Sequence, residues 1–268
     1  MLSPLAYIHP SARLAAGVTV EPFTTIAADV EIGEGSWIGP NVTIMNGARI
    51  GQNCQIFPGA VIGAVPQDLK FAGEQTTAVI GDHTVIRECV TVNRGTVDRG
   101  ETRIGSHCLL MAYVHIAHDC IVGNHCILAN TVQVAGHVEI GDYAIVGGSS
   151  AVHQFVKIGA HAMVSGGSLV RKDVPPYVKA GREPLSYAGA NSVGLRRRGF
   201  SEAAINMVQQ FYRTLFLGGL NTQDALAQIE AELPPSAERD SALSFVRAAT
   251  RGIIKGPKRG RPDGSEAE

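Results

Sequence analysis

IGSHCLLMAYVHIAHDCIVGNHCILANTVQV, residues 104–134, places an aliphatic residue at every sixth position. Counting in both directions from Ile104 gives 28 such positions between residues 8 and 170, and 25 of them are isoleucine, leucine or valine. A helix has a period of about 3.6 and a strand of about 2, so neither produces a period of six. Three hexapeptides predict one coil of three short parallel strands, and coils stack about 4.8 Å apart. The expected fold class is therefore mainly β, a left-handed parallel β-helix built from hexapeptide repeats.

A second small residue lies four positions after the first aliphatic residue of each hexapeptide. Cysteine occupies this inward position in several coils, where other coils have valine or alanine: Cys54, Cys108, Cys120 and Cys126. These thiols are predicted to fill the core and not to bind metal. The five cysteines of the chain are an odd number without a CxxC pair, which favours free thiols in a reducing cytoplasm.

The composition excludes several classes of function. A formal net charge of -1 over 268 residues gives no general attraction for nucleic acid or an anionic membrane. No apolar run approaches the roughly 20 residues of a transmembrane helix, so we do not expect an integral membrane protein. The first residues, MLSPLAYIHPSARL, lack the charged and apolar regions of a secretory signal. A cytoplasmic location is expected.

The repeat also predicts the domain organisation. Residues 1–184 are expected to form the β-helix, interrupted by polar, glycine-bearing loops at 65–79 and 94–103. Long loops on a rigid solenoid are often functional, although both could be inert surface loops. Helical periodicity from Ser201 predicts a small C-terminal helical domain within 185–255. Residues 256–268 are polar and glycine-rich and are expected to form a disordered tail.

Residues 18 apart fall in one column of the predicted prism. His118, Gly136 and Gln154 form such a column, and His137 and His153 are each offset from it by one residue. Two coil spacings put the ends of this column about 9–10 Å apart. The sequence therefore predicts a polar cleft here that carries the function. A different set of histidines shares the fourth hexapeptide position and is predicted to be repeat filling on the outer face: His83, His107, His125 and His161.

A zinc site is the main alternative for the histidines. The gamma-class carbonic anhydrases, which have a left-handed β-helix, bind zinc across a trimer interface with a His-x4-His pair. Here His115 and His118 are separated by two residues, and Asp119 follows His118 as a candidate orienting partner. Because zinc needs three or four ligands at about 2.1 Å, this spacing does not favour a metal site, and none is expected.

Several motifs resemble a known family along essentially the whole chain. They are HIAHDCIVGN at 115–124, QDLK at 67–70, RGT at 94–96, AGH at 135–137, AVHQF at 151–155, DVPPYV at 173–178 and GLRRRGF at 194–200. Together they resemble the bacterial UDP-N-acetylglucosamine acyltransferases. That resemblance implies transfer of an (R)-3-hydroxyacyl chain from acyl carrier protein to the 3-hydroxyl of UDP-N-acetylglucosamine, the first step of lipid A biosynthesis. It also implies a homotrimer with each active site between neighbouring prisms, and no cofactor.

The resemblance implies a role for each matching residue. His118 would be the general base, Asp119 would orient its ring, and the Gly136 N–H would bind the oxyanion. An imidazole suits this role because it titrates near neutrality. Gly166 would leave the acyl channel open and so act as the acyl-chain ruler. Residues implied to contact substrate are Gln67, Asp68, Lys70, His115, His137, His153, Gln154, Asn191, Arg197 and Arg198.

Three positions depart from the family pattern. Asn93 stands where many members have histidine, Val193 where a glutamate assists nucleotide binding, and Pro184 where some relatives have histidine. These departures leave open the acyl-chain length and whether a 3-amino sugar nucleotide is accepted. Three other functions also remain open: an acetyl-CoA-dependent hexapeptide transferase, the related N-acyltransferase that acts later in the pathway, and a scaffold without catalytic activity.

Overall fold

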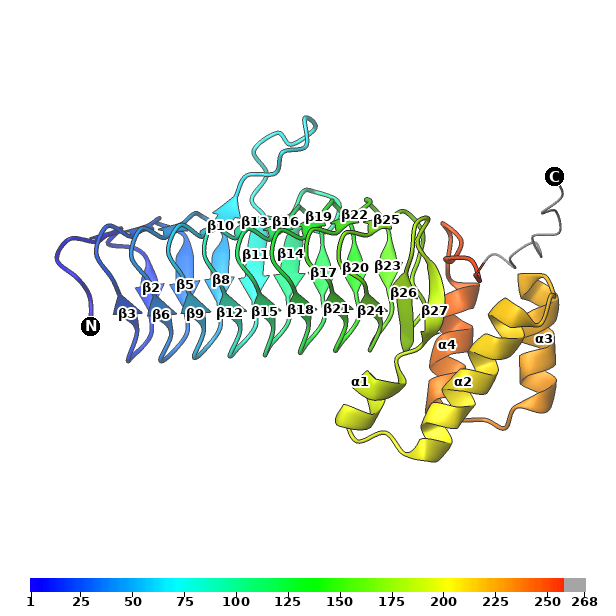
Figure 1. Cartoon of the computed structure of the whole chain (residues 1–268). Helices are drawn as coiled ribbons and strands as arrows, with labels where there is room; N and C mark the ends of the chain where they lie inside the picture. The colour runs from blue at the N-terminus through cyan, green and yellow to red at the C-terminus, as the bar shows by residue number, and fades with distance from the viewer. Residues whose placement is uncertain (258–268) are drawn as a thin grey trace, which may run out of the picture.

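The computed structural model describes residues 1–257, which form a long three-sided prism with helices at its C-terminal end (Figure 1). Each coil of the prism contributes one short strand to each of three sheets. The first sheet has nine strands: β1 (Tyr7–Ile8), β4 (Thr25–Ile26), β7 (Thr43–Ile44), β10 (Val61–Ala64), β13 (Thr91–Asn93), β16 (His115–Ile116), β19 (Gln133–Val134), β22 (Ala151–Val152) and β25 (Leu169–Val170).

The other two sheets follow the same plan. The second has eight strands: β2 (Arg13–Leu14), β5 (Val30–Ile32), β8 (Ala48–Ile50), β11 (Thr77–Ile80), β14 (Glu101–Ile104), β17 (Ile121–Val122), β20 (Glu139–Ile140) and β23 (Lys157–Ile158). The third has ten: β3 (Thr19–Val20), β6 (Trp37–Ile38), β9 (Gln55–Ile56), β12 (Val85–Ile86), β15 (Leu109–Leu110), β18 (Ile127–Leu128), β21 (Ile145–Val146), β24 (Met163–Val164), β26 (Val178–Gly181) and β27 (Ser186–Ala190). All pairs are parallel except β26 with β27, which extends the third sheet beyond residue 184.

The repeated aliphatic residues fill the inside of the prism. Ile116 pairs with Val134, eighteen residues later, and both side chains are fully buried. Burying one such side chain stabilises the fold by roughly 1.5–3 kcal/mol. Because an aliphatic residue recurs at every sixth position, this burial is repeated in every coil. The predicted place of the cysteines is also confirmed, because all four at the small inward position are buried: Cys54, Cys108, Cys120 and Cys126.

The turns between strands use a left-handed backbone at the fourth hexapeptide position. His107 and His125, for example, have φ of 57° and 55°. Asparagine, aspartate and histidine tolerate this conformation better than most residues. At one corner the rings at this position stack 4.5–4.9 Å apart along the axis: His83, His107, His125, Tyr143 and His161. These histidines lie at turns, as the repeat predicts, but His161 is not on an open outer face: its Nδ1 is buried, and its ring meets Phe200 edge-on with centroids 5.0 Å apart.

Two loops leave the prism on the side of β10 and β13. The first spans 65–76 and projects furthest (Figure 1), and the second spans 94–100. Both are shorter than the sequence predicts, because their last residues extend β11 and β14, which pair from Thr77 with Glu101 to Ile80 with Ile104. The hydrogen bonds between β11 and β14 therefore begin three residues before the aliphatic repeat resumes at Ile80 and Ile104.

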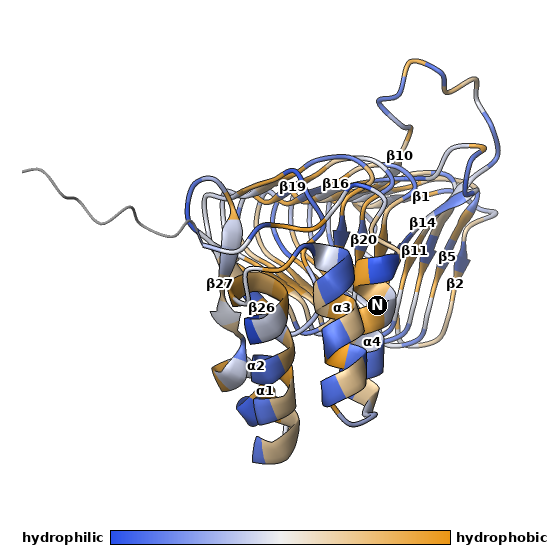
Figure 2. Cartoon of the chain, turned by 90° about the vertical axis from the view of Figure 1, so that its right-hand side faces the viewer, coloured by the Kyte–Doolittle hydropathy of each residue, from blue (hydrophilic) through white to orange (hydrophobic). Residues whose placement is uncertain are grey.

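Within residues 1–257, four helices follow β27, each with an N-cap side chain that accepts a backbone hydrogen bond. They are α1 (Ser192–Arg197), α2 (Glu202–Leu217), α3 (Thr222–Glu232) and α4 (Ala237–Arg247). Seen from their end of the molecule, α2, α3 and α4 carry both hydrophilic and hydrophobic segments (Figure 2). The buried Tyr212 of α2 donates its hydroxyl to the carbonyl of Pro176, 2.7 Å away, which ties the helices to the last coil.

After α4 the chain returns to the prism. Asp173 bridges to Ile253, and Ser186 bridges to Lys255. The expected disordered tail at 256–268 lies, from residue 258 onward, outside the described residues. None of the helices within residues 1–257 is both long and apolar enough to cross a bilayer.

Candidate active site

A cleft of about 660 Å³ opens where the first loop overhangs the turns that follow β16, β19 and β22. It gathers residues from three successive coils and from the loop at 65–76. The lining residues are Gln67, Asp68, Leu69, Lys70, Asn93, His115, Ala117, His118, Ala135, Gly136, His137, Gln154 and Phe155. The structure thus brings together eight of the predicted site residues. Asn93, one of the three positions that differ from the family pattern, lies among them.

The column predicted from the repeat is present in the cleft. A side chain at Gly136 would place its Cβ 2.6 Å from Cε1 and 2.7 Å from Nε2 of His118. The ring of His118 therefore lies directly over Gly136, and glycine leaves the space that the ring occupies. Within residues 1–257 the N–H of Gly136 donates no hydrogen bond.

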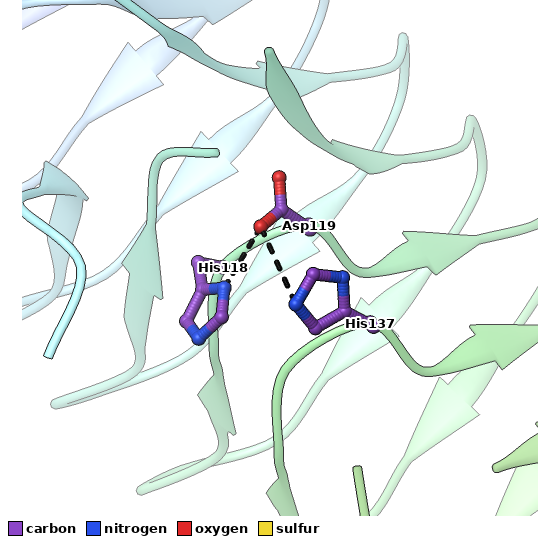
Figure 3. A group of neighbouring side chains, drawn as sticks. All are labelled: His118, Asp119 and His137. Atoms are coloured by element: carbon purple, nitrogen blue, oxygen red, sulfur yellow. Dashed lines mark hydrogen bonds and ion pairs between the residues drawn. The ribbon is translucent and has the colours of Figure 1, made fainter. Parts of the chain in front are cut away.

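Asp119 lies behind His118, is fully buried and has φ of 58°. Its Oδ2 is 2.8 Å from Nδ1 of His118, and both imidazole rings of the site face this carboxylate (Figure 3). Burial alone raises the pKa of Asp119, but hydrogen bonds from Thr96 and His118 outweigh it and hold that pKa below its ordinary value. An ionised Asp119 requires Nδ1 of His118 to donate, which in the neutral tautomer leaves Nε2 as a proton acceptor.

The second loop closes over Asp119. Thr96 donates its N–H to Oδ1 at 2.9 Å and its hydroxyl to Oδ2 at 2.6 Å, and the N–H of Arg99 is 3.3 Å from Oδ1. Sequence reasoning did not single out Thr96 as a site residue. The available signal was its place in RGT, inside a loop that breaks the repeat.

His137 contacts both carboxylates of this region. Its Nδ1 is 3.2 Å from Asp98 of the second loop, and its Nε2 is 3.8 Å from Asp119. Its ring stacks on Phe155 with centroids 4.5 Å apart and meets His118 edge-on at 5.0 Å. Within residues 1–257, one ligand atom each from His118, Asp119 and His137 lie within 4.8 Å of one another. A metal ion there would have to displace the hydrogen bonds that Asp119 already accepts.

His115 borders the cleft on strand β16. Its Nδ1 is 2.7 Å from the hydroxyl of Thr91. Burial lowers the pKa of His115 below its ordinary value, and the neighbouring His118 adds to that effect. Both effects favour the neutral form of the ring. His153 is exposed, lies outside the lining set, and places Nδ1 3.1 Å from the carbonyl of Gln154.

The remaining predicted residues lie away from this cleft in the single chain. Asn191 caps α1, and its amide donates to the carbonyl of His161 at 2.9 Å. Arg197 is exposed, whereas Arg198 stacks over Tyr143 and donates to its carbonyl at 3.0 Å. Nη1 of Arg198 is buried without a hydrogen-bond partner in the described part of the chain.

Gly166 is on another corner of the prism, in the turn after β24. A Cβ there would lie 3.1 Å from the carbonyl oxygen of Gly148, one coil earlier. The three departures are also widely spread. Asn93 is buried at the cleft and donates to the carbonyl of Val65 at 3.2 Å, Val193 is exposed on α1, and Pro184 lies between β26 and β27.

Comparison with known proteins supports the same identification as the motifs. A family model described as UDP-N-acetylglucosamine O-acyltransferase, domain 2, matches residues 173–254, and a bacterial transferase hexapeptide model matches 29–64 and 101–136. An acyl-[acyl-carrier-protein]–UDP-N-acetylglucosamine O-acyltransferase of Trichlorobacter lovleyi is 55% identical over 94% of this chain and 98% of its own. One of Thiobacillus denitrificans is 46% identical over 95% and 99%.

Solved structures agree with this match. A UDP-N-acetylglucosamine acyltransferase from Bacteroides fragilis has a TM-score of 0.94 at 50% identity and covers 95% of this chain and 100% of its own. These matches confirm the expected fold class, a left-handed parallel β-helix with a small helical C-terminal part.

Proposed function

Because the chain belongs to the UDP-N-acetylglucosamine O-acyltransferase family and is an acyltransferase, we propose a specific reaction for it. It transfers an (R)-3-hydroxyacyl chain from acyl carrier protein to the 3-hydroxyl of UDP-N-acetylglucosamine, with His118 as general base. One observation carries the assignment of the base. The buried, ionised Asp119 accepts a hydrogen bond from Nδ1 of His118. The other ring nitrogen, Nε2, lies above Gly136 and is then free to accept the proton of the sugar hydroxyl.

The proton and the acyl group then move as follows. Nε2 of His118 takes the proton of the sugar hydroxyl while the hydroxyl oxygen attacks the thioester carbonyl carbon. The carbonyl oxygen becomes an oxyanion, which the N–H of Gly136 stabilises because that group has no partner within residues 1–257. The C–S bond breaks, and the sulfur of the carrier takes the proton back from His118. No cofactor is required for this exchange.

The other lining residues would hold the two substrates. Gln67, Asp68 and Lys70 overhang the cleft from the first loop, where Asp68 is a candidate acceptor for the 3-hydroxyl of the acyl chain. The neutral ring of His115 and the amide of Gln154 offer hydrogen bonds without adding charge beside the base. His137, between Asp98 and Asp119, would line the sugar site, with His153 at its edge.

The residues proposed to bind the nucleotide and the far end of the acyl chain lie away from the cleft of the same chain. Arginine suits a pyrophosphate because its planar guanidinium donates two parallel hydrogen bonds, which favours Arg197 and Arg198 as nucleotide ligands beside Asn191. Gly166 would mark the end of the acyl channel. We place these residues at the cleft of a neighbouring subunit in a homotrimer, and the enzyme in the cytoplasm. All five cysteines are free thiols, which supports a reducing compartment.

Analysis of the products tests the reaction. The protein is incubated with UDP-N-acetylglucosamine and a panel of 3-hydroxyacyl carrier-protein thioesters, and products are measured by mass spectrometry. We expect an O-acylated nucleotide sugar and free carrier thiol. Consumption of acetyl-CoA in place of the carrier thioester would instead identify an acetyltransferase. Product from a 3-amino sugar nucleotide alone would change the acceptor.

Removal of the base tests the mechanism. His118→Ala should lower kcat by about 10²- to 10⁴-fold, the usual contribution of a positioned general base. The fold should be retained, because the His118 side chain lies outside the core columns of Ile116 and Cys120. His107→Ala is the matched control, since that ring lies in the outer stacked column, and its kcat should stay near wild type. Near-normal turnover in a folded His118→Ala protein would show that another residue is the base, and His137 would be the next residue to test.

A further inference from the structure

The hydroxyl of Thr96 has a fixed direction in the second loop. Its Oγ1 accepts from the N–H of Asp98 at 3.3 Å and lies 2.6 Å from Oδ2 of Asp119. An ionised carboxylate cannot donate, so the hydroxyl proton must point at Asp119. The distance is in the range of charge-assisted O–H···O⁻ bonds, which are about twice as strong as neutral ones.

The same carboxylate oxygen serves His118. Oδ2 receives the Thr96 hydroxyl at 2.6 Å and Nδ1 of His118 at 2.8 Å, while Oδ1 receives two backbone N–H groups of the loop. The carboxylate therefore has one orientation that satisfies all of its donors. A rotation of Asp119 that moved Oδ2 away from His118 would also break the bond from Thr96.

The loop that carries Thr96 is fastened on both sides of that residue, to the end of the first loop and to the prism. Before it, the hydroxyl of Thr76 donates to the carbonyl of Gly95 at 2.5 Å, and a Cβ at Gly95 would collide with the backbone of Glu101. After it, Arg99 bonds to Glu139 at 2.5 Å, and Glu139 also pairs with Lys157 at 3.1 Å. Thr96 is 7% exposed, so water competes weakly for its hydroxyl.

We propose, on the premise that His118 is the general base, that Thr96 is a positioning residue for the reaction. Its hydroxyl holds Oδ2 of Asp119 toward His118 and shares the negative charge on that oxygen. Without the hydroxyl, Oδ2 would interact more strongly with the protonated ring of His118. The ring would then hold its proton more tightly, besides being less well oriented.

Two variants at position 96 test this role. Thr96→Val keeps the shape and the backbone N–H but loses the hydroxyl, so we expect kcat to fall about 10- to 100-fold, the range for one hydrogen bond to a charged group. The KM for the nucleotide sugar should change less than kcat, because Thr96 is not among the residues that line the 660 Å³ cleft; it borders an adjoining pocket of about 310 Å³ with Asp68, Lys70 and His137. The acid limb of the kcat–pH profile should move to higher pH. Thr96→Ser, which restores the hydroxyl, should recover most of kcat and the wild-type profile.

Thr84→Val is the matched control for lost stability. Thr84 is fully buried, and its hydroxyl donates to the carbonyl of Gly105 at 2.8 Å, on a different corner of the prism. It should lower the unfolding midpoint without moving the kcat–pH profile. Equal kcat and pH profiles for the two valine variants would overturn the positioning role.

A double-mutant cycle keeps the test valid if Thr96→Val is also less stable. If Thr96 acts through Asp119, adding Thr96→Val to an Asp119→Asn protein should lower kcat little further. Full additivity of the two losses would overturn the proposal. Failure of the premise gives a separate result, because a fully active His118→Ala protein would refute the base and leave the contacts of Thr96 unaffected.

Discussion

Residues with a left-handed backbone build the site as well as the turns. Asp119, His137 and Phe155 occupy the fourth hexapeptide position in three successive coils, with φ of 58°, 62° and 65°. Because this position repeats every 18 residues at one corner, Asp119 meets the edge of His137 and His137 stacks on Phe155. His118 and Gly136 occupy the preceding position of the same turns. A turn requirement of the fold thus places the carboxylate of Asp119 directly beside the ring of His118.

Asp119→Asn separates orientation from proton transfer. If the carboxylate mainly orients the ring of His118, kcat should fall, but by less than the 10²- to 10⁴-fold loss expected for His118→Ala. The amide keeps the size of the side chain but can no longer accept from every donor that surrounds it. Steady-state kinetics of both folded variants would check the order, and a larger loss for Asp119→Asn would contradict it.

The same variant tests a pH effect on stability. The pKa of Asp119 in the folded protein is below its ordinary value, so its stabilising effect is present above the unfolded-state pKa and is lost as pH falls through the folded-state pKa. Chemical denaturation of wild type should therefore show a loss of unfolding free energy in acid that is smaller in Asp119→Asn. Identical slopes in the two proteins would exclude this linkage.

At the scale of elements, the repeat builds the prism, and the two loops that leave it supply further residues to the site. The loop at 65–76 overhangs the cleft. The loop at 94–100 instead contacts the buried Asp119 behind it. Arg94 connects them, since its guanidinium lies over Phe71 and donates to the carbonyl of Asn46. Both loops emerge between the first and second sheets, so the corner that carries His118 and His137 is also the one that carries the insertions.

The turn after β24 provides a test of the acyl-chain ruler. Gly166→Met should shorten the preferred chain by several carbons, if this turn closes the far end of the acyl channel. Gly166→Ala is the control, because a Cβ there meets one backbone oxygen at 3.1 Å and needs only a small adjustment. Competition between carrier thioesters of different length would measure the preference. An unchanged preference in folded Gly166→Met protein would move the ruler elsewhere, with the region of Pro184 next to examine.

At the scale of the whole molecule, one chain keeps His118 apart from the residues proposed to bind the nucleotide and the end of the acyl chain. His118 lies on one corner of the prism, Gly166 on a second, and Arg198 beside Tyr143 on the third. Packing three parallel prisms around an axis would bring different corners of neighbouring subunits together. Sedimentation is expected to give a mass three times 28.2 kDa, and a stable monomer at micromolar concentration would exclude the assembly.

Mixed trimers test the shared site directly. His118→Ala and Arg198→Ala proteins should each be nearly inactive, because every site then lacks one group. Co-expression in equal amounts should restore activity in about one site in four, since random mixing gives both intact groups at that frequency. Retention of the low activity in verified mixed trimers would place both groups in one subunit's site.

The amino-acid sequence alone determined the repeat and everything that the repeat controls. A period of six assigns each residue to a sheet, a corner and a coil by counting, so the core columns, the buried cysteines and the stacking of His118 on Gly136 were all predictable. The family was predictable as well, from motifs such as HIAHDC and QDLK. These features follow from local backbone geometry, which is the same in every coil.

The tertiary structure decided what happens where the repeat stops. The contacts of Thr96 with Asp119 and of Asp98 with His137 join residues 23 and 39 positions apart through a loop that has no period. Counting cannot predict the path of such a loop, because its conformation depends on long-range packing and on hydrogen bonds that its own sequence does not specify. The same reason explains why the two loops end earlier than expected, where β11 and β14 pair.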